Sequence, residues 1–320
     1  MFDIAALGEL LIDFTQAGVS ENGMRLFEQN PGGGVPNAMA AAAKLGARTA
    51  FIGKVGNDMH GAFLKQALEG VGVGTDGLVF ADDVFTTLAF VSLTDGERAF
   101  SFARKPGADT CLKTEEIDMS LVTGAKVFHI SSLSLTDEPA RTATRDALKA
   151  AKAAGVLVSY DPNYRASIWR DEAAAVAGMR SVLPYVDILK VSDEETALLS
   201  GHAAPEAALK AFNGMGVLCA MVTLGKDGAL VGVGGKTAAV PAFPVAKIVD
   251  TTGAGDAFMG GFLAAFLSGG SELAALTLER AAAYARVGCA TASLATQKRG
   301  GITGMPEKAA VDALLAADRP

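Results

Sequence analysis

The hydrophobic positions along the chain follow two alternating spacings. Short apolar runs of strand length, such as "AKVFHIS" and "VLVSYD", are separated by a longer segment, "PARTATRDALKAAKAAG", in which apolar residues recur every three or four positions. Alternation of this kind is typical of a parallel sheet with helices on both faces. We therefore predict an α/β fold with a mostly parallel central sheet.

One section breaks this rhythm. The stretch "VFTTLAFVSLTDGERAFSFARKPGAD" reads as two β-rich runs joined by Asp95-Gly96, a dipeptide typical of hairpin turns. We expect the segments of about 10–30 and 85–105 to form a small β-sheet lid. Because no repeat or linker divides the chain, we predict one α/β domain over residues 1–320 with these segments inserted in it.

Composition and charge narrow the choice of partners. The chain has 320 residues, half of them hydrophobic, and a formal net charge of -7. This balance is that of a compact globular protein, and it argues against non-specific attraction to nucleic acid or to anionic lipid. A small-molecule partner is the expectation that remains.

The cysteines and the first residues bear on the compartment. Cys111, Cys219 and Cys289 lie far apart and form no CxxC pair, so the sequence predicts neither a metal cage nor a disulfide framework. The start "MFDIAALGEL" has no basic leader and no run long enough to span a bilayer. We therefore expect a reduced, cytoplasmic protein that does not enter a membrane.

The stretch "VDTTGAGDAFMGG" at residues 249–261 carries the strongest chemical signal. Phenylalanines recur every fourth residue from Phe258, which predicts that a helix begins near Gly255 or Asp256. The amides of Gly253, Ala254 and Gly255 would then converge at the helix N-terminus, where no large side chain hinders an approaching phosphate. We expect an anion hole there.

Asp256 lies inside this predicted anion hole. A carboxylate in the first helical turn can simply complement the helix dipole, and this structural interpretation remains open. A carboxylate beside a phosphate is otherwise unfavourable, unless it takes the proton from a hydroxyl that attacks phosphorus. The second interpretation makes Asp256 the general base of a kinase.

A second glycine cluster, "NPGGGVPNAMAAAAKLG", also opens a predicted helix. It can be an ordinary strand-to-helix turn, but Gly32, Gly33 and Gly34 would also let a ligand approach the main chain. Asn37 can both donate to and accept from sugar hydroxyls, and Asp13, expected at the end of the first strand, can accept from two. The cluster favours polyol recognition.

Rival motifs are weaker. The segment "GVGTDG" matches the dinucleotide pattern G-x-G-x-x-G, which would make the chain an NAD(P)-dependent oxidoreductase. It follows a predicted helix, however, whereas the dinucleotide turn follows a strand. Neither a P-loop nor a G-x-S-x-G elbow occurs in the sequence. The oxidoreductase is therefore a weak alternative.

Taken together, these residues resemble the ribokinase or PfkB family of carbohydrate kinases, over nearly the whole chain. The matching stretches are "GELLIDF", "PGGGVPNAMAAAAKLG", "VGNDMHGAFL" and "DTTGAGDAFMGGF". Within the family, "SLSLTDEPARTAT", "DPNYRASIW" and "LKVSDEE" look most like the fructokinase branch, which adjoins the 2-keto-3-deoxygluconate kinases. The resemblance implies a ribokinase-like fold with a small β-sheet lid.

The resemblance implies transfer of the γ-phosphoryl group of ATP, with Mg²⁺, to a primary sugar hydroxyl. Fructose, giving fructose 6-phosphate, is the expected acceptor, with Asp256 as base and the amides of residues 253–255 stabilising the transferred group. A 2-keto-3-deoxygluconate kinase, a ribokinase and a nucleoside kinase remain alternatives from the same family. A sensor that has lost turnover is a further alternative, against which the retained Asp256 argues.

The resemblance also assigns binding positions for the sugar. The family's sugar contacts correspond to Asp13, Gly32, Gly33, Gly34 and Asn37. In the neighbouring branch two arginines that correspond to Arg104 and Arg165 meet the sugar, although each can instead be a solvated surface charge. Phe90 and Phe102 are the lid residues that would cover a nucleoside base.

For the nucleotide, "TLGKDG" resembles the family's nucleotide loop and implicates Thr223, Gly225 and Gly228. Glu195 matches the glutamate of an Asn-x-x-Glu element that influences Mg²⁺ and phosphate, and Ser192 stands where many members have Asn. Asp250 and Thr252 correspond to a monovalent cation site, so K⁺ activation is an open expectation. Two lids packing together would make the protein a homodimer.

Overall fold

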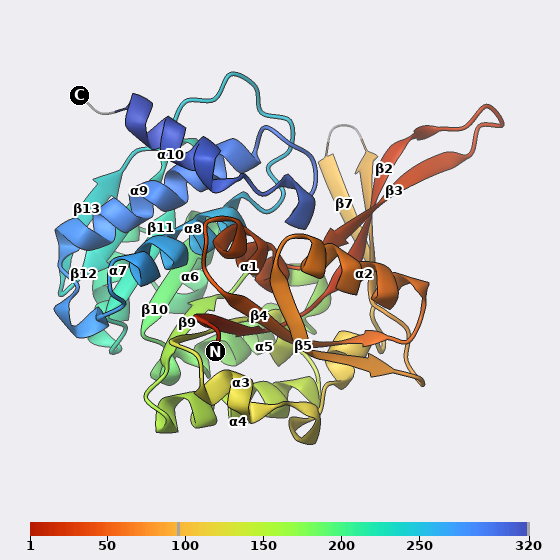
Figure 1. Cartoon of the computed structure of the whole chain (residues 1–320), viewed down its shortest axis with the longest axis horizontal. Helices are drawn as coiled ribbons and strands as arrows, with labels where there is room; N and C mark the ends of the chain where they lie inside the picture. The colour runs from red at the N-terminus through yellow and green to blue at the C-terminus, as the bar shows by residue number, and fades with distance from the viewer. Residues whose placement is uncertain (95–96, 319–320) are drawn as a thin grey trace.

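The computed structural model describes residues 1–94 and 97–318, which form two sheets and their covering helices (Figure 1). The central sheet has the order β13-β12-β11-β10-β9-β8-β1-β4-β5, and its pairings are parallel except at β12 and β13. Its strands are β1 (Ile4–Leu7), β4 (Thr49–Gly56), β5 (Val73–Ala81), β8 (Val127–Ser131), β9 (Leu157–Asp161), β10 (Ile188–Ser192), β11 (Cys219–Thr223), β12 (Ala229–Val233) and β13 (Lys236–Val240).

Helices cover both faces of the central sheet, because the side chains of each strand alternate between two separate cores. On β1, for example, Ile4 and Ala6 belong to one core and Ala5 and Leu7 to the other. The first core takes α1 (Gly34–Lys44), α2 (Met59–Gly70), α8 (Ala254–Ser268), α9 (Leu278–Ala295) and α10 (Lys308–Ala317). The second takes α3 (Met119–Thr123), α4 (Ala140–Ala153), α5 (Glu172–Arg180), α6 (Asp193–Ser200) and α7 (Pro205–Gly214). The predicted fold class is confirmed.

A second, smaller sheet has the order β3-β2-β6-β7 and is called the small sheet below. It consists of β2 (Leu11–Val19), β3 (Arg25–Gly32), β6 (Leu88–Thr94) and β7 (Glu97–Ala103). The hairpin of β2 and β3 extends away from the body of the molecule (Figure 1). The predicted turn at Asp95-Gly96 lies outside the described residues.

Asp13 is not at the end of the first strand, as the sequence analysis expected. The apolar run is split: β1 ends at Leu7 in the central sheet, and Asp13 lies in β2 of the small sheet. Buried Glu9 marks the break, because its carboxylate accepts from the amide of Gly34 at 2.6 Å and from the hydroxyl of Ser131 at 2.9 Å. These bonds turn the chain out of one sheet and into the other.

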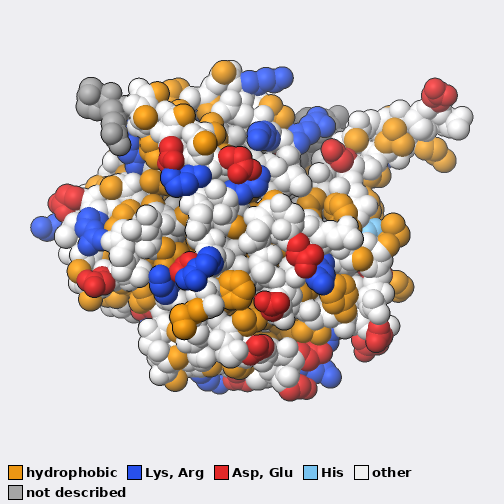
Figure 2. Space-filling view, viewed as in Figure 1, with side chains coloured by type: hydrophobic (Ala, Val, Ile, Leu, Met, Phe, Trp, Pro, Cys, Tyr) orange, Lys and Arg blue, Asp and Glu red, His pale blue; other side chains and the backbone are white. Residues whose placement is uncertain are grey.

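The surface carries both signs of charge. On the face shown in Figure 2, basic and acidic side chains are interspersed, and hydrophobic side chains gather along the β2–β3 hairpin. Val19, Met24 and Leu26 of this hairpin are 60%, 68% and 48% exposed. Among the described residues, no helix combines the length and the apolar character that crossing a membrane requires.

Candidate active site

A cavity of about 860 Å³ opens at the carboxyl ends of the adjacent strands β9, β10 and β11. Open α/β sheets bind ligands at this edge. Most of the predicted site residues line the cavity, namely Asp13, Gly33, Gly34, Asn37, Phe102, Arg165, Ser192, Glu195, Thr223, Gly225, Gly228, Thr252, Gly253, Ala254, Gly255 and Asp256. Four others, Gly32, Phe90, Arg104 and Asp250, are not among its lining residues.

The N-terminus of α8 forms one wall of the cavity. The helix begins at Ala254, and Gly253 before it has a left-handed φ of 75°, which a glycine adopts without strain. The amide of Ala254 already donates to the carbonyl of Thr251 at 3.2 Å. Within the described chain, the amides of Gly253 and Gly255 have no acceptor of this kind. Two of the three expected amides are therefore available to an anion.

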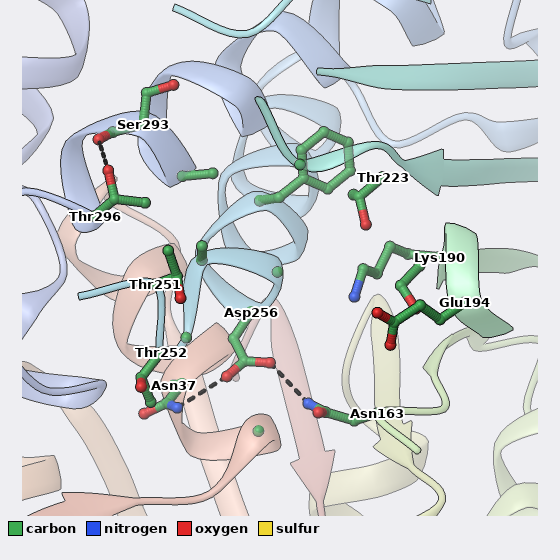
Figure 3. A pocket seen from close by; sticks show the side chains of 18 of the residues that line it. Asn37, Asn163, Lys190, Glu194, Thr223, Thr251, Thr252, Asp256, Ser293 and Thr296 are labelled. Atoms are coloured by element: carbon green, nitrogen blue, oxygen red, sulfur yellow. Dashed lines mark hydrogen bonds between the residues drawn. The ribbon is translucent and has the colours of Figure 1, made fainter. Parts of the chain in front are cut away.

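Asp256 lies in the first turn of α8 and is only 7% exposed. One carboxylate oxygen accepts from the side-chain amide of Asn37 at 2.9 Å, and the other from that of Asn163 at 2.8 Å (Figure 3). Burial raises the pKa of Asp256 to about 7, and the negative charge of Asp161 adds to the rise. A carboxylate with this pKa is suited to general base catalysis near neutral pH.

Lys190, which the sequence analysis missed, lies beside the anion hole. Its ammonium forms a buried ion pair with Asp161, at 3.0 Å and 3.2 Å from the two carboxylate oxygens. A methyl group placed on Gly255 would lie 2.8 Å from Nζ, so the charge is next to the open amides. Burial alone would lower the pKa of Lys190, but the surrounding carboxylates outweigh it and raise the pKa, so the side chain is cationic.

A sequence signal for Lys190 existed. Lysine is rarely buried without a partner, and Lys190 stands within the apolar strand "DILKVS". Aspartate is likewise rarely buried without a partner, and Asp161 stands at the end of the apolar strand "VLVSYD". Two opposite charges in neighbouring buried strands indicate a pair, but only the strand order shows that β9 and β10 are neighbours.

The glycines of the second cluster leave room for site side chains. A methyl group on Gly34 would overlap the side-chain amide of Asn163, and one on Gly32 would overlap the carboxylate of Asp13. Burial raises the pKa of Asp13 to about 6, against the lowering effect of Arg165. Close approach of neighbouring side chains therefore explains the glycines at positions 32 and 34 without any contact with a ligand.

The two predicted arginines lie in different environments. Arg165 lines the cavity, and its guanidinium donates to the carbonyl of Tyr164 at 2.9 Å. Arg104 is buried, so it is not a solvated surface charge; it donates to Asp109 at 2.8 Å and to the carbonyl of Leu133 at 2.9 Å. The prediction that Arg104 contacts the sugar finds no support in this geometry, because its donors are used inside the protein.

The two predicted lid aromatics also differ. Phe102 lines the cavity. Phe90 stacks on Phe14 with ring centroids 5.3 Å apart and meets Phe27 edge to face, and it is not among the cavity-lining residues. Pairing within the small sheet therefore explains Phe90 better than contact with a ligand does.

Glu195 has both carboxylate oxygens occupied by main-chain amides. One accepts from Ser192 at 2.8 Å, which caps α6, and the other accepts from Tyr164 at 2.7 Å. The side chain is buried, so any influence of Glu195 on Mg²⁺ is indirect. Across residues 1–94 and 97–318, no group of three His, Cys, Asp or Glu side chains could hold a metal ion.

The far end of the cavity combines a glycine turn with apolar walls. Gly225 and Gly228 follow β11 with positive φ values of 57° and 95°, next to Thr223. Phe243 and Cys289 line the opposite side, and burial raises the pKa of Cys289 to about 12, so its thiol is neutral. This end suits a flat aromatic base with a phosphate tail leading to α8.

Asp250 and Thr252 lie in the turn before α8. The carboxylate of Asp250 accepts from the amide of Thr252 at 2.9 Å and from that of Gly300 at 3.4 Å. Asp250 thus ties the turn to the segment after α9.

The segment "GVGTDG" does not form a dinucleotide turn. Gly74 and Gly77 lie within β5, an edge strand, and no helix begins after them at this point. The dinucleotide motif needs a helix N-terminus to hold the pyrophosphate. This geometry weakens the oxidoreductase alternative.

Comparisons with known proteins agree on one family. The model of the "pfkB family carbohydrate kinase" matches residues 1–308. "Probable fructokinase-5" of Arabidopsis thaliana is 40% identical over 317 residues, covering 98% of this chain and 97% of that protein. The ATP-bound fructokinase of Xylella fastidiosa superposes with a TM-score of 0.91 at 32% identity, covering 99% of each chain. A double mutant of the Vibrio cholerae O395 fructokinase, in a fructose, ADP and potassium ion bound form, superposes with a TM-score of 0.88 at 32% identity, covering 98% of each.

Proposed function

The chain belongs to the pfkB family of carbohydrate kinases, and we propose that it transfers the γ-phosphoryl group of ATP to fructose, giving fructose 6-phosphate. The relatives named above are fructokinases, and one of their structures holds fructose and ADP. The observation that carries the proposal is the placement of Asp256. It is buried beside two open amides and the Lys190 ammonium, in a cavity of about 860 Å³.

These residues account for the chemical step. Asp256 takes the proton of the primary hydroxyl, whose oxygen forms a bond to the γ-phosphorus while the bond from that phosphorus to the ADP oxygen breaks. The amides of Gly253 and Gly255 and the ammonium of Lys190 stabilise the negative charge on the transferred group. Asp13 and Arg165, which also line the cavity, would hold the sugar hydroxyls.

Two metal ions belong to the proposal. Mg²⁺ would be held mainly by the phosphates of ATP and by water, because the described residues offer no acidic cluster for it. It would neutralise phosphate charge during transfer. For K⁺, the main-chain carbonyls of the turn at Asp250 and Thr252 are the candidate ligands, supported by the potassium-bound relative.

An ADP-release screen tests the proposed acceptor. Fructose, ribose, 2-keto-3-deoxygluconate, tagatose and nucleosides are compared at equal concentration with ATP and Mg²⁺. We expect fructose to give the highest kcat/KM. A higher value for 2-keto-3-deoxygluconate, ribose or a nucleoside would move the chain to that branch of the family. If no acceptor in the screen led to release of ADP, the proposed kinase activity itself would be contradicted.

Assembly and location complete the proposal. We propose a homodimer through the small sheet, because Val19, Met24 and Leu26 expose apolar surface on its β2–β3 hairpin. Light scattering of the wild type should give twice the mass of one chain, and light scattering of Leu26→Lys should give the mass of a single chain. The cytoplasm, where ATP is supplied, is the proposed site of the reaction, and the three free cysteines fit a reducing compartment.

A further inference from the structure

Asn163 has no role in the function described so far, yet it touches the proposed base. Its side-chain amide donates to Asp256 at 2.8 Å, while Asn37 donates to the other carboxylate oxygen at 2.9 Å (Figure 3). The two donors come from different parts of the fold, one from α1 and one from the segment after β9. Together they hold the carboxylate plane from both sides.

The backbone of Asn163 is held in an unusual conformation. Its φ is 51°, in the left-handed region that asparagine tolerates better than most residues do. Its own amide donates to Asp161 at 3.2 Å, and the following amide, of Tyr164, donates to Glu195 at 2.7 Å. The preceding carbonyl, of Pro162, accepts from Ser132 at 3.0 Å. Neighbouring strands and α6 thus impose this conformation.

Close packing restricts the side chain of Asn163 to one orientation. Asn163 is 9% exposed, and a methyl group on Gly34 would overlap its amide nitrogen. A buried amide without an acceptor is costly, so its contact with Asp256 is also the way its donor is satisfied. Backbone conformation, packing and hydrogen bonding all direct the side chain at the base.

We propose that Asn163 is a positioning residue that fixes the orientation of the Asp256 carboxylate and favours its charged form. The inference rests on the proposed function of Asp256 as base. Each carboxylate oxygen has two lone pairs, and the two amides take one on each. The carboxylate therefore cannot rotate, and its remaining lone pairs keep a constant direction for the acceptor hydroxyl.

The charged groups around Asp256 come from several elements. The carboxylates are Asp161 at the end of β9 and Asp13 in β2; the cations are Lys190 in β10 and Arg165 in the segment after β9. Asn163 is neutral, so replacing it by another neutral residue changes none of these charges. The variant therefore tests the contact of Asn163 with Asp256 without changing the surrounding charges.

Asn163→Gly is the sharpest variant, because glycine keeps the left-handed backbone while the side-chain amide is removed together with its methylene group. We expect kcat to fall roughly 10- to 100-fold with little change in the KM for the sugar. We also expect the acid limb of the kcat profile to move up by on the order of one pH unit, because a donor to the charged form is lost. Ser271→Gly is the matched control: Ser271 also has a positive φ, of 55°, but does not line the cavity, and its kinetics should be unchanged.

A second variant and a second readout keep the test decisive. Asn163→Asp keeps the shape but places a carboxylate against Asp256, so kcat should fall further than in Asn163→Gly. Carbon-13 titration of labelled aspartates, with Asp256→Asn for assignment, reports the pKa of Asp256 without turnover. A rise in that pKa in Asn163→Gly supports the inference even if the proposed reaction fails. Wild-type kcat together with an unmoved pKa in Asn163→Gly would overturn it, as would full activity in Asn163→Asp.

Discussion

Two helix N-termini face the same cavity, and each carries a carboxylate at its third residue. In α6, Glu195 reaches back to the amide of Ser192 and so caps its own helix. In α8, Asp256 is turned toward two asparagine side chains, and the amides of Gly253 and Gly255 stay open in the described structure. The same position thus caps the helix in α6, whereas in α8 it leaves the helix amides open for the chemistry that we propose.

Side-chain length and neighbours explain the difference. Glutamate has the extra methylene that lets it return to the cap residue, as in a capping box. Asp256 is shorter and meets Asn37 and Asn163 instead. A site that must bind a phosphate leaves helix amides without internal partners, which an ordinary helix avoids. An open helix end therefore marks the reactive end of this cavity.

The largest expected effect comes from Asp256→Asn. The variant keeps the shape and removes the base, so kcat should fall by roughly 10²- to 10⁴-fold. Calorimetric titration with fructose should show sugar binding within a few-fold of wild type. Unchanged turnover would show that Asp256 only complements the helix dipole. The carboxylates of α6 and α8 would then both have a structural role.

The pH dependence of kcat should follow the protonation of Asp256. Because the pKa of Asp256 is raised to about 7, the base is protonated below that pH, and kcat should drop about tenfold for each further unit. Below about pH 6 Asp13 is protonated as well, and the KM for the sugar should rise. Initial rates between pH 5 and pH 9 at saturating ATP measure both. A flat kcat profile down to pH 5 would contradict the base assignment.

Gly255→Ala tests the placement of the Lys190 ammonium beside the open amides. The added methyl group would stand 2.8 Å from Lys190 Nζ, displacing the ammonium from the anion hole, and we expect kcat to fall by about tenfold. Gly214→Ala is the matched control. Gly214 ends α7 with no atom near the added methyl group, so activity should not change. Equal activities of the two variants would show that transfer does not depend on the position of the Lys190 ammonium beside Gly255.

The smallest effects are on stability, and they should have opposite signs at the two helix ends. Glu195→Ala leaves the amides of Ser192 and Tyr164 without acceptors and should lower the free energy of unfolding by roughly 2–4 kcal/mol. Asp256→Asn should raise it at pH 8 by on the order of a few kcal/mol, because a charge is no longer buried.

The sign of the Asp256 effect follows from its raised pKa. Between the ordinary value of 3.8 and about 7 the folded state binds a proton that the unfolded state has released, so the stability of the wild type falls as pH rises. The gain from Asp256→Asn should therefore vanish near pH 4. Urea unfolding of both variants at pH 4 and pH 8 measures this, and a destabilised Asp256→Asn at pH 8 would go against it.

Local signals in the sequence located the reactive helix. The phenylalanine spacing and the glycines predicted the start of α8 within two residues of Ala254. They also singled out Asp256 and Asn37, because both depend on neighbours within one helical turn or one glycine cluster. Asn163, in the segment after β9, carried no comparable local signal, and the signal of Lys190, a lysine within an apolar strand, did not show which carboxylate it meets.

Resemblance assigned some residues that the tertiary structure places elsewhere. Arg104 was expected at the sugar but is neutralised by Asp109 inside the protein, and Phe90 packs within the small sheet. Glu195 was expected to influence Mg²⁺ indirectly; it lines the cavity and also caps α6. Phe14 is far from Phe90 along the chain, so only the tertiary structure shows that pair. Asp109 and Ser192 lie within five residues of Arg104 and Glu195, so these two contacts were within reach of a local pattern.

The sequence alone therefore determined most of the elements, the fold class and the helix end that carries Asp256, because periodicity and glycine conformation are properties of short segments. Only the tertiary structure decided that Asn37 and Asn163 meet at Asp256 and that Lys190 lies beside Gly255. It also decided the raised pKa of Asp256, since burial and neighbouring charge depend on which strands become adjacent.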